Sequence, residues 1–413
     1  MIYIPFIYFS LLLFFIYKKR GFDASAYITL LYVITSFASI LMASKQLIEP
    51  VKNSPSFVST LVYCVLLGLL ILPVYLFDSK KIKKIIITHN KAVDWLVYLN
   101  FISFLFTIVI YWPDILFKLT YGDWDELRTI VMRGDGISKV HITGLLKMVS
   151  NILSIIGSAS FLMFPIFFIS LIYYKKPWWY SLMAILSTTN VIWLGIMAID
   201  RSATFRWLLF LGLNLVIFWP LLTSKVRRVI LPLLSVLVLG ALAYIMSVSM
   251  SRFEDTSDGT KGSLISYAGQ PYFNFCYFFE NFNNHEGITT KYLLPATHCW
   301  ILGDYESTVH RQQELTLKTG MECGVFYTVL GTFILDANQI GPFIFIILYL
   351  IIFLQCLKGK NRGGIITLWS FIKIYLVLLI PTFGIIAYLY VNQYTNLFIV
   401  ILFLAHYLYA VKY

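Results

Sequence analysis

Long runs of apolar residues, seldom interrupted by a charge, dominate this sequence. The runs are continuously apolar instead of alternating at every second position, so they fit helices and not the strands of a β-barrel. A helix needs about 20 such residues to cross the hydrocarbon core of a bilayer. Eleven runs approach or reach this length and are predicted to be transmembrane helices: 2–17, 24–43, 57–77, 95–116, 148–174, 179–198, 204–223, 229–249, 339–357, 365–390 and 395–411.

The composition supports a membrane protein. Of the 413 residues, 59% are hydrophobic and 17% are aromatic, whereas only 13% are charged. Soluble domains average roughly 45–50% apolar and about 25% charged residues. A soluble core of this size could not bury so much apolar surface, so a water-soluble globular protein, a disordered chain and a disulfide scaffold are excluded. The expected fold is all-α: a polytopic helix bundle that forms a single integral membrane domain over residues 1–413.

Basic residues greatly outnumber acidic ones in every second loop between the predicted spans, whereas the other loops, with the span ends beside them, hold 14 basic and 17 acidic residues. The first set has only three acidic residues, Asp23, Asp78 and Asp94, beside 17 basic ones: Lys18, Lys19, Arg20, Lys80, Lys81, Lys83, Lys84, Lys91, Lys175, Lys176, Lys225, Arg227, Arg228, Lys358, Lys360, Arg362 and Lys412. Because positive charge marks the cytoplasmic side, the N-terminus is predicted to lie outside and the C-terminus inside. The net charge of +12 then reflects membrane topology, and no nucleic-acid partner is expected.

Polar chemistry is predicted on the outer side, where two segments are longer than a connection between helices requires. Residues 117–147 form a loop of medium length, and residues 250–338 form a loop of 89 residues. Aromatic clusters in the long loop fit short helices that lie in the membrane interface or re-enter between spans, with a purely structural cap as the alternative. The inner loops are short and lack a P-loop, which excludes an ATP-driven transporter.

No spacing indicates a metal or cofactor site. The five cysteines and six histidines form neither a CxxC nor an HExxH motif, so neither a metal nor a cofactor is expected. Three cysteines, Cys276, Cys299 and Cys323, lie in the long loop. An oxidising compartment would permit one disulfide among them.

Arginines on the predicted outer side are the leading candidates for binding an anion. They are Arg128, Arg133, Arg201, Arg206, Arg252 and Arg311. An unpaired arginine at the bilayer edge costs on the order of 1–3 kcal/mol. Snorkelling of the side chain, or for Arg201 a pair with Asp200, is one interpretation. The other is an anionic ligand, because the planar guanidinium group binds phosphate through two hydrogen bonds.

Candidates for a general base lie in the long loop, because a histidine or a carboxylate can take the proton of a reacting hydroxyl group. The predicted candidates are His298 and Glu280. A solvated surface position is the alternative interpretation for each of them.

Three stretches, together with the arginines that follow the fourth span, resemble a known family. GIMAIDRSATFRWLLFLGLNLVIF resembles the arginine-containing junction between two spans of the Wzy-type O-antigen polymerases, which polymerise oligosaccharide repeat units. SLISYAGQPYFNFCYFFEN resembles their segment after a span, and GVFYTVLGTFILDANQIGPFIFIILYLIIF resembles their last-loop signature. The order agrees over roughly residues 120–357. Two positions depart from the pattern, since Asp336 precedes Ala-Asn instead of Phe-Gly and Asp200 replaces a small residue.

The resemblance implies inverting, metal-independent glycosyl transfer at the periplasmic face of the bacterial inner membrane. It implies an undecaprenyl-pyrophosphate-linked polysaccharide as donor and an undecaprenyl-pyrophosphate-linked repeat unit as acceptor, with membrane lipid, a chain-length regulator and a flippase as partners. Catalytic roles are expected for Arg128, Arg133, Arg201 and Arg252, with His298 or Glu280 as base. Contacts to the substrate are expected from Arg206, Arg311, Tyr267, Tyr272 and Asp336.

Two other functions fit parts of the pattern. An O-antigen ligase, or another glycosyltransferase that uses a lipid carrier, would share the long outer loop. A flippase for lipid-linked oligosaccharides is expected to have two pseudo-repeated halves with short loops, and the 89-residue loop argues against it.

Overall fold

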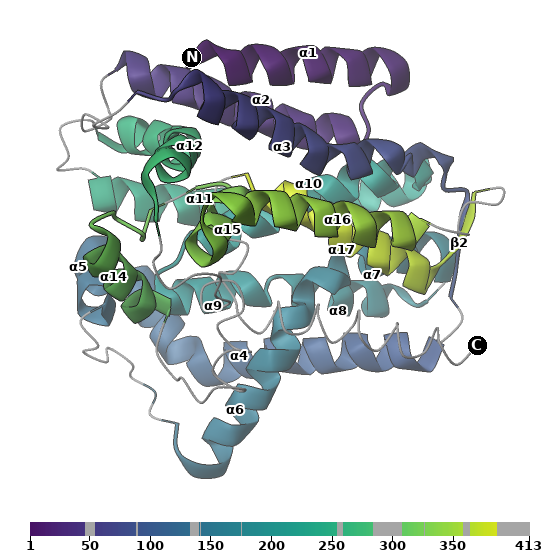
Figure 1. Ribbon diagram of the computed structural model, residues 1–413. Coiled ribbons are helices and arrows are strands. Elements are labelled where there is room, and N and C mark those ends of the chain that lie inside the picture. The colour runs from purple at the N-terminus through teal and green to yellow at the C-terminus, as the bar shows by residue number, and fades with distance from the viewer. Residues whose placement is uncertain are drawn as a thin grey trace. The chain divides into compact units, whose positions relative to one another are not determined.

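The computed structural model of the chain describes residues 1–45, 54–87, 90–132, 140, 142–174, 176–253, 259–283, 308–325, 327–357 and 364–385. Helices dominate this part of the chain (Figure 1). Eight of them are long and apolar enough to cross a membrane: Ala24–Ser44, Phe57–Lys81, Lys91–Tyr121, Gly144–Tyr174, Trp178–Ala198, Ser202–Leu221, Ser224–Ser251 and Val329–Leu357. Each overlaps a predicted span. The expectation of a helical, multi-pass membrane protein is confirmed at this level.

Two further predicted spans do not reach this standard, and a third is not described by the structure. Helix α1 (Tyr3–Arg20) covers the run 2–17 but has three basic residues in its last turn, and α17 (Leu368–Phe383) has only 16 residues. The run 395–411 lies outside the described residues. The count of eleven spans and the orientation of the chain therefore stay predictions.

The chain divides into two compact units, and each unit combines segments that are distant in sequence. Unit 1 comprises Met1–Ile82, Lys261–Gly364 and Trp369–Tyr413, and unit 2 comprises Lys83–Thr260 and Ile365–Leu368. That residues 1–413 form a single integral membrane domain stays a prediction.

Unit 1 is built around helices from both ends of the sequence. Its elements are α1, α2 (Ala24–Ser44), α3 (Phe57–Leu76), η1 (Ser79–Lys81), α12 (Gly259–Asn281), α14 (Thr308–Thr319), α15 (Val329–Ala337), η5 (Asn338–Ile340), α16 (Gly341–Leu357) and α17. Helices α1, α2 and α3 pack on one another, and α16 packs on α3 (Figure 1). The chain turns sharply into α2 because the Asp23 carboxylate accepts a hydrogen bond from the Ala26 amide at 3.0 Å, which caps the helix.

Unit 2 contains the remaining elements. They are β1 (Lys84–Ile86), α4 (Asn90–Tyr121), α5 (Trp124–Met132), α6 (Gly144–Gly157), η2 (Ser158–Leu162), α7 (Met163–Ile169), η3 (Ser170–Tyr174), α8 (Trp178–Thr188), α9 (Asn190–Ala198), α10 (Ser202–Phe218), η4 (Trp219–Leu221), α11 (Ser224–Phe253) and β2 (Ile365–Thr367). Helices α6, α8 and α9 pack on α4, while α10 packs on α7, α9 and α11 (Figure 1). The two strands pair in parallel, with Lys84 opposite Ile365.

The predicted outer loop 117–147 is partly helical. Helix α4 continues to Tyr121, and α5 follows after two residues. Helix α5 begins there because the Asp123 carboxylate accepts hydrogen bonds from the amides of Asp125, at 3.1 Å, and Glu126, at 3.0 Å. Trp124 and Leu127 then bury one face of the helix. The acidic DWDE sequence is thus the start of a helix.

The predicted outer loop 250–338 also contains more regular structure than expected. Helix α12 has 23 residues, which is longer than the short helices predicted for this loop, and α14 follows with 12. The last candidate span begins at Val329 instead of 339, and it is interrupted where Asn338 adopts a φ of 52° between α15 and α16. With ψ at −152°, Asn338 adopts a backbone conformation that residues other than glycine rarely adopt, and the helix is broken there.

Candidate functional site

The junction between α9 and α10 in unit 2 is a tight turn of unusual backbone conformation. Ile199, which is buried, has φ 53° and ψ 37°. A β-branched residue in this left-handed region is strained by about 1–3 kcal/mol. The Asp200 amide donates to the Gly195 carbonyl at 2.8 Å and the Ile199 amide donates to the Ile196 carbonyl at 3.2 Å. These two bonds form a Schellman motif, which ends α9 and places Arg201 at the start of α10.

Gly195 is required by the same turn. A Cβ atom at this position would lie 2.8 Å from the Asp200 carbonyl oxygen and 3.0 Å from the Cβ of Ala203. Only glycine lets the last turn of α9 approach the first turn of α10 this closely. The glycine in the GIMAIDRSA stretch therefore sets the position of the arginine that follows it.

Arg201 is held inside unit 2 by a neighbouring helix. Its side chain is 7% exposed, and Nη1 donates a hydrogen bond of 2.6 Å to Oγ of Ser249 in α11. Ser249 is fully buried, and its hydroxyl donates to the Ile245 carbonyl at 2.6 Å. A buried guanidinium with fixed hydrogen bonds is a preorganised positive charge.

Asp200 contacts the residues that follow Arg201. Its Oδ1 accepts from the Ser202 amide and its Oδ2 from the Ser202 hydroxyl, each at 2.8 Å. The same carboxylate lies 3.8 Å from Nη2 of Arg206. The described contacts of Asp200 are thus a cap on α10 and an ion pair with Arg206, and its pairing with Arg201 stays an interpretation from the sequence.

Helix α5 is anchored to α11 beside Ser249. The Trp124 amide donates to the Ser251 hydroxyl at 2.9 Å, and the indole Nε1 donates to the Ser247 hydroxyl at 3.1 Å. The indole ring meets the ring of Tyr244 edge to face, with centroids 5.7 Å apart. A buried cluster of Ile115, Leu127, Ile196, Ile199 and Val248 surrounds this contact. The contact therefore joins α4, α5, α9 and α11.

The backbone places two further predicted arginines near this contact. Arg128 lies one turn after Trp124 on α5, and Arg252 immediately follows Ser251 on α11. Their side chains, and those of Arg133 and Arg311, are outside the described part, as is all of His298. The elements that carry Arg128, Arg201 and Arg252 nevertheless meet at one end of unit 2. We call this region the α9–α10 junction.

Lys118 is a cationic residue of the junction that the sequence interpretation missed. It is 4% exposed, and its ammonium group donates to the carbonyl of Met197 in the last turn of α9. Lysine at a helix C-terminus satisfies an unpaired carbonyl and complements the helix dipole. Asp114, which is fully buried, lies one turn earlier on α4. The Asp-Lys spacing of four residues at the end of an apolar run was the available signal.

Glu280, a predicted base, caps a helix in unit 1. Its carboxylate accepts hydrogen bonds from the Ser56 amide, at 2.9 Å, and from the Ser59 hydroxyl at the start of α3. Desolvation raises the pKa of Glu280, but these hydrogen bonds outweigh it and leave the pKa below its ordinary value. A carboxylate with a lowered pKa is a weaker base. The geometry thus favours a structural role for this residue.

The other predicted contacts in unit 1 are partly or fully inside the protein. Tyr272 is 1% exposed, its hydroxyl lies 2.8 Å from that of Thr60, and its ring packs on Tyr63 with centroids 5.1 Å apart. Tyr267 is half-buried on α12, and Asp336 is buried near the end of α15. Tyr272 therefore stabilises the packing of α12 on α3. Contact of these three residues with a substrate stays a prediction.

Two of the three cysteines predicted for the long loop are buried thiols. Cys276 and Cys323 are both unpaired with another cysteine. Burial raises the pKa of Cys276 to about 12 and that of Cys323 to about 11. Cys299 lies outside the described residues. Protonated, buried thiols react slowly.

Among the described residues, no group of three or more His, Cys, Asp or Glu side chains could hold a metal ion. Comparison with known proteins gives no assignment: no protein-family model, no curated protein and no solved structure matches this chain.

Proposed function

We propose that the chain is a membrane glycosyltransferase that polymerises oligosaccharide repeat units carried on undecaprenyl pyrophosphate. The observation that carries this proposal is the α9–α10 junction, where Arg201 is buried and bonded to Ser249. It lies beside the elements that carry Arg128 and Arg252. The resemblance of the three sequence stretches to Wzy-type polymerases supports the same function.

The chemistry suits fixed guanidinium groups. In the inverting transfer, the bond between the donor's anomeric carbon and the pyrophosphate oxygen breaks, and the acceptor hydroxyl oxygen bonds to that carbon. The hydroxyl proton passes to a base, and undecaprenyl pyrophosphate leaves with the bonding electrons. Preorganised positive charge in a water-poor site stabilises the charge that develops on the leaving group. Arg201 is the leading candidate for this role, with Arg128 and Arg252 on neighbouring elements.

The proposal includes the membrane topology predicted from the sequence. Eleven spans with the N-terminus outside and the C-terminus inside would place the α9–α10 junction at the outer face of the bacterial inner membrane. The support is the alternation of basic loops along the chain. Lipid-linked donors and acceptors would reach the junction laterally, from the bilayer.

The proposal is tested by deleting the chromosomal gene and separating the surface glycan on a gel. A polymerase deletion should leave a single repeat unit where the parent strain shows a ladder. The wild-type gene should restore the ladder, whereas Arg201→Ala should lower chain extension by about 10²–10³-fold at an unchanged protein level. Arg201→Lys should also fail, because lysine lacks the planar fork of donors.

A matched control comes from the other end of α11. Arg228→Ala removes an exposed arginine of the same helix and should leave the ladder unchanged. Glycan that stays polymerised but unattached after deletion would instead identify a ligase. Repeat units that remain on the cytoplasmic side would identify a flippase, and either result would overturn the proposal.

A further inference from the structure

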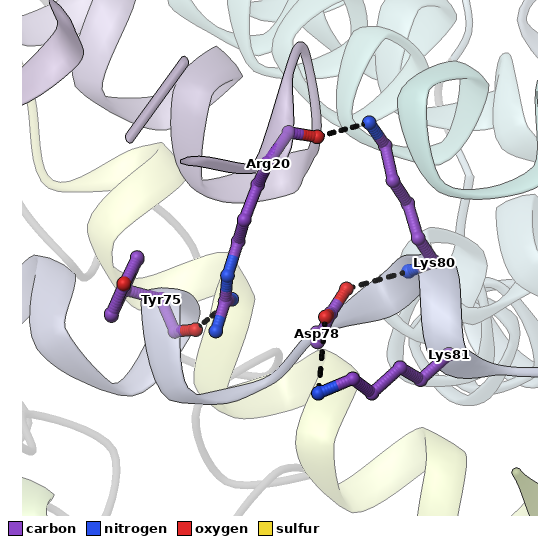
Figure 2. A network of polar contacts seen from close by, with 5 residues as sticks. All are labelled: Arg20, Tyr75, Asp78, Lys80 and Lys81. Carbon is purple, nitrogen blue, oxygen red and sulfur yellow. Dashed lines mark hydrogen bonds and ion pairs between the residues drawn. The ribbon is translucent and has the colours of Figure 1, made fainter. Parts of the chain in front are cut away.

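Five basic residues gather in unit 1 where α1 ends and where η1 follows α3. Lys18, Lys19 and Arg20 form the last turn of α1, and Lys80 and Lys81 lie in η1. Figure 2 shows Arg20, Lys80 and Lys81 around Tyr75 and Asp78. We call these five residues the basic end of α1 and α3.

Two of the five cations tie the helix ends together. The Arg20 guanidinium donates to the Tyr75 carbonyl, and its Cζ lies 4.0 Å from the centroid of the Tyr75 ring. The Lys80 ammonium group donates to the Arg20 carbonyl (Figure 2). Each bond satisfies a carbonyl that a helix leaves unpaired at its C-terminus. Gly21, at φ 66°, allows the chain to leave α1 here.

The other three cations are accessible to solvent, although Nζ of Lys19 also lies 5.8 Å from the centroid of the Tyr75 ring. Lys18 and Lys19 are exposed, and the side chain of Lys81 is 73% exposed. Two carboxylates lie nearby in sequence. Asp78 is 3.4 Å from the Lys81 ammonium group, whereas Asp23 is buried as the cap of α2. An excess of exposed positive charge therefore remains on a scaffold whose geometry Arg20 and Lys80 fix.

An apolar surface borders this charge on the same two helices. Phe14, Phe15 and Tyr17 on α1 are more than half exposed, and Leu72 and Leu76 on α3 are also exposed. These residues precede the basic ends by one or two turns. A ligand that satisfies both surfaces must combine a negative headgroup with apolar chains.

We propose that the basic end of α1 and α3 binds the headgroup of an anionic glycerophospholipid, whose acyl chains lie along the exposed apolar faces of the two helices. Lys18, Lys19 and Lys81 contact the headgroup phosphate, while Arg20 and Lys80 hold the two helix ends together. The apolar border favours a lipid over a soluble phosphate compound. This site is independent of the proposed glycosyl transfer.

The test is lipid-dependent stabilisation of the purified full-length chain in a neutral detergent. A ligand that binds only the folded state raises the melting temperature with its concentration. Phosphatidylglycerol should raise the melting temperature at concentrations where phosphatidylcholine, or inorganic phosphate, does not. In the triple variant Lys18→Gln, Lys19→Gln, Lys81→Gln, the concentration of phosphatidylglycerol needed should rise about five-fold for each lysine removed.

Two variants serve as controls. Lys225→Gln, Arg227→Gln, Arg228→Gln removes the same charge from a basic segment at the start of α11 and should respond to phosphatidylglycerol like the wild type. Lys18→Arg, Lys19→Arg, Lys81→Arg keeps the charge and should also bind. If both glutamine variants lost the response to phosphatidylglycerol equally, the response would depend only on overall charge, and the proposal would be overturned. An equal rise in the melting temperature of the wild type with phosphatidylcholine or with inorganic phosphate would also overturn the proposal. This comparison uses only the wild-type protein, so it does not depend on whether a variant folds.

Discussion

The α9–α10 junction and the basic end of α1 and α3 are both rich in cations, yet they hold them in opposite ways. Arg201 is 7% exposed and donates to Ser249, whereas the side chain of Lys81 is 73% exposed. A buried charge is tolerated only where hydrogen bonds and counter-charges compensate its desolvation, so its geometry is fixed. An exposed lysine moves freely and is screened by salt. The first arrangement suits transition-state stabilisation, and the second suits adaptable binding of a headgroup.

The largest effect on the junction is expected from Trp124→Ala. This change removes a fully buried ring and the hydrogen bond from its indole to Ser247 in α11, and it should destabilise unit 2 by about 3–5 kcal/mol. Hydrogen exchange should show faster exchange in α5 than in α7. Trp95→Ala, at a side chain that is 63% exposed, provides the matched control. Equal protection of α5 in both variants would mean that the indole does not anchor this helix.

Removing the acceptor of Arg201 comes next in magnitude. Ser249→Ala deletes a hydrogen bond from a charged donor, and such a bond contributes about 1.5–3 kcal/mol. The free energy of unfolding should decrease, and the glycan chains in the ladder should become shorter. Ser249→Thr retains the hydroxyl and should recover part of each. An unchanged glycan ladder in Ser249→Ala would show that the serine hydroxyl does not position Arg201.

Alanine substitutions at two glycines should have opposite effects on stability, because one glycine lies in the tight turn and the other within a regular helix. Gly195→Ala places a Cβ against the Asp200 carbonyl and should cost about 1–3 kcal/mol. Gly240→Ala, in α11, meets nothing within 4 Å and should stabilise the protein by roughly 0.5–1 kcal/mol. Thermal unfolding of the two variants side by side checks this opposite sign. A stabilised Gly195→Ala variant would show that the turn can open.

The smallest effect on stability is expected from a substitution at the basic end of α1 and α3. Asp78→Asn breaks an ion pair with the exposed ammonium group of Lys81, and such a pair contributes about 0–1 kcal/mol. The melting temperature without lipid should hardly change, while the affinity for phosphatidylglycerol should increase because one negative charge is gone. Weaker lipid binding in this variant would show that Asp78 orders the site instead of competing with it.

Much of the fold could be predicted from run lengths, but the details of the site could not. The runs 24–43 and 57–77 correspond to α2 and α3 because a helix that crosses a bilayer must be continuously apolar. Lys118 was predicted to lie in a loop, since hydropathy alone cannot show that the Met197 carbonyl accepts a hydrogen bond from its ammonium group. Likewise, the carboxylate of Glu280 is a chemical group that can act as a base, but its hydrogen bonds show that it caps α3.

The sequence by itself determined that the chain is a helical membrane protein, which regions of it are apolar, and which arginines merit attention. Only the tertiary structure decided which cations are buried and which face solvent. The reason is that their partners are remote in the chain: Arg201 bonds a serine 48 residues away, and Trp124 bonds one 127 residues away. Local periodicity records the environment of a helix face, but it contains no information about which distant side chain arrives there.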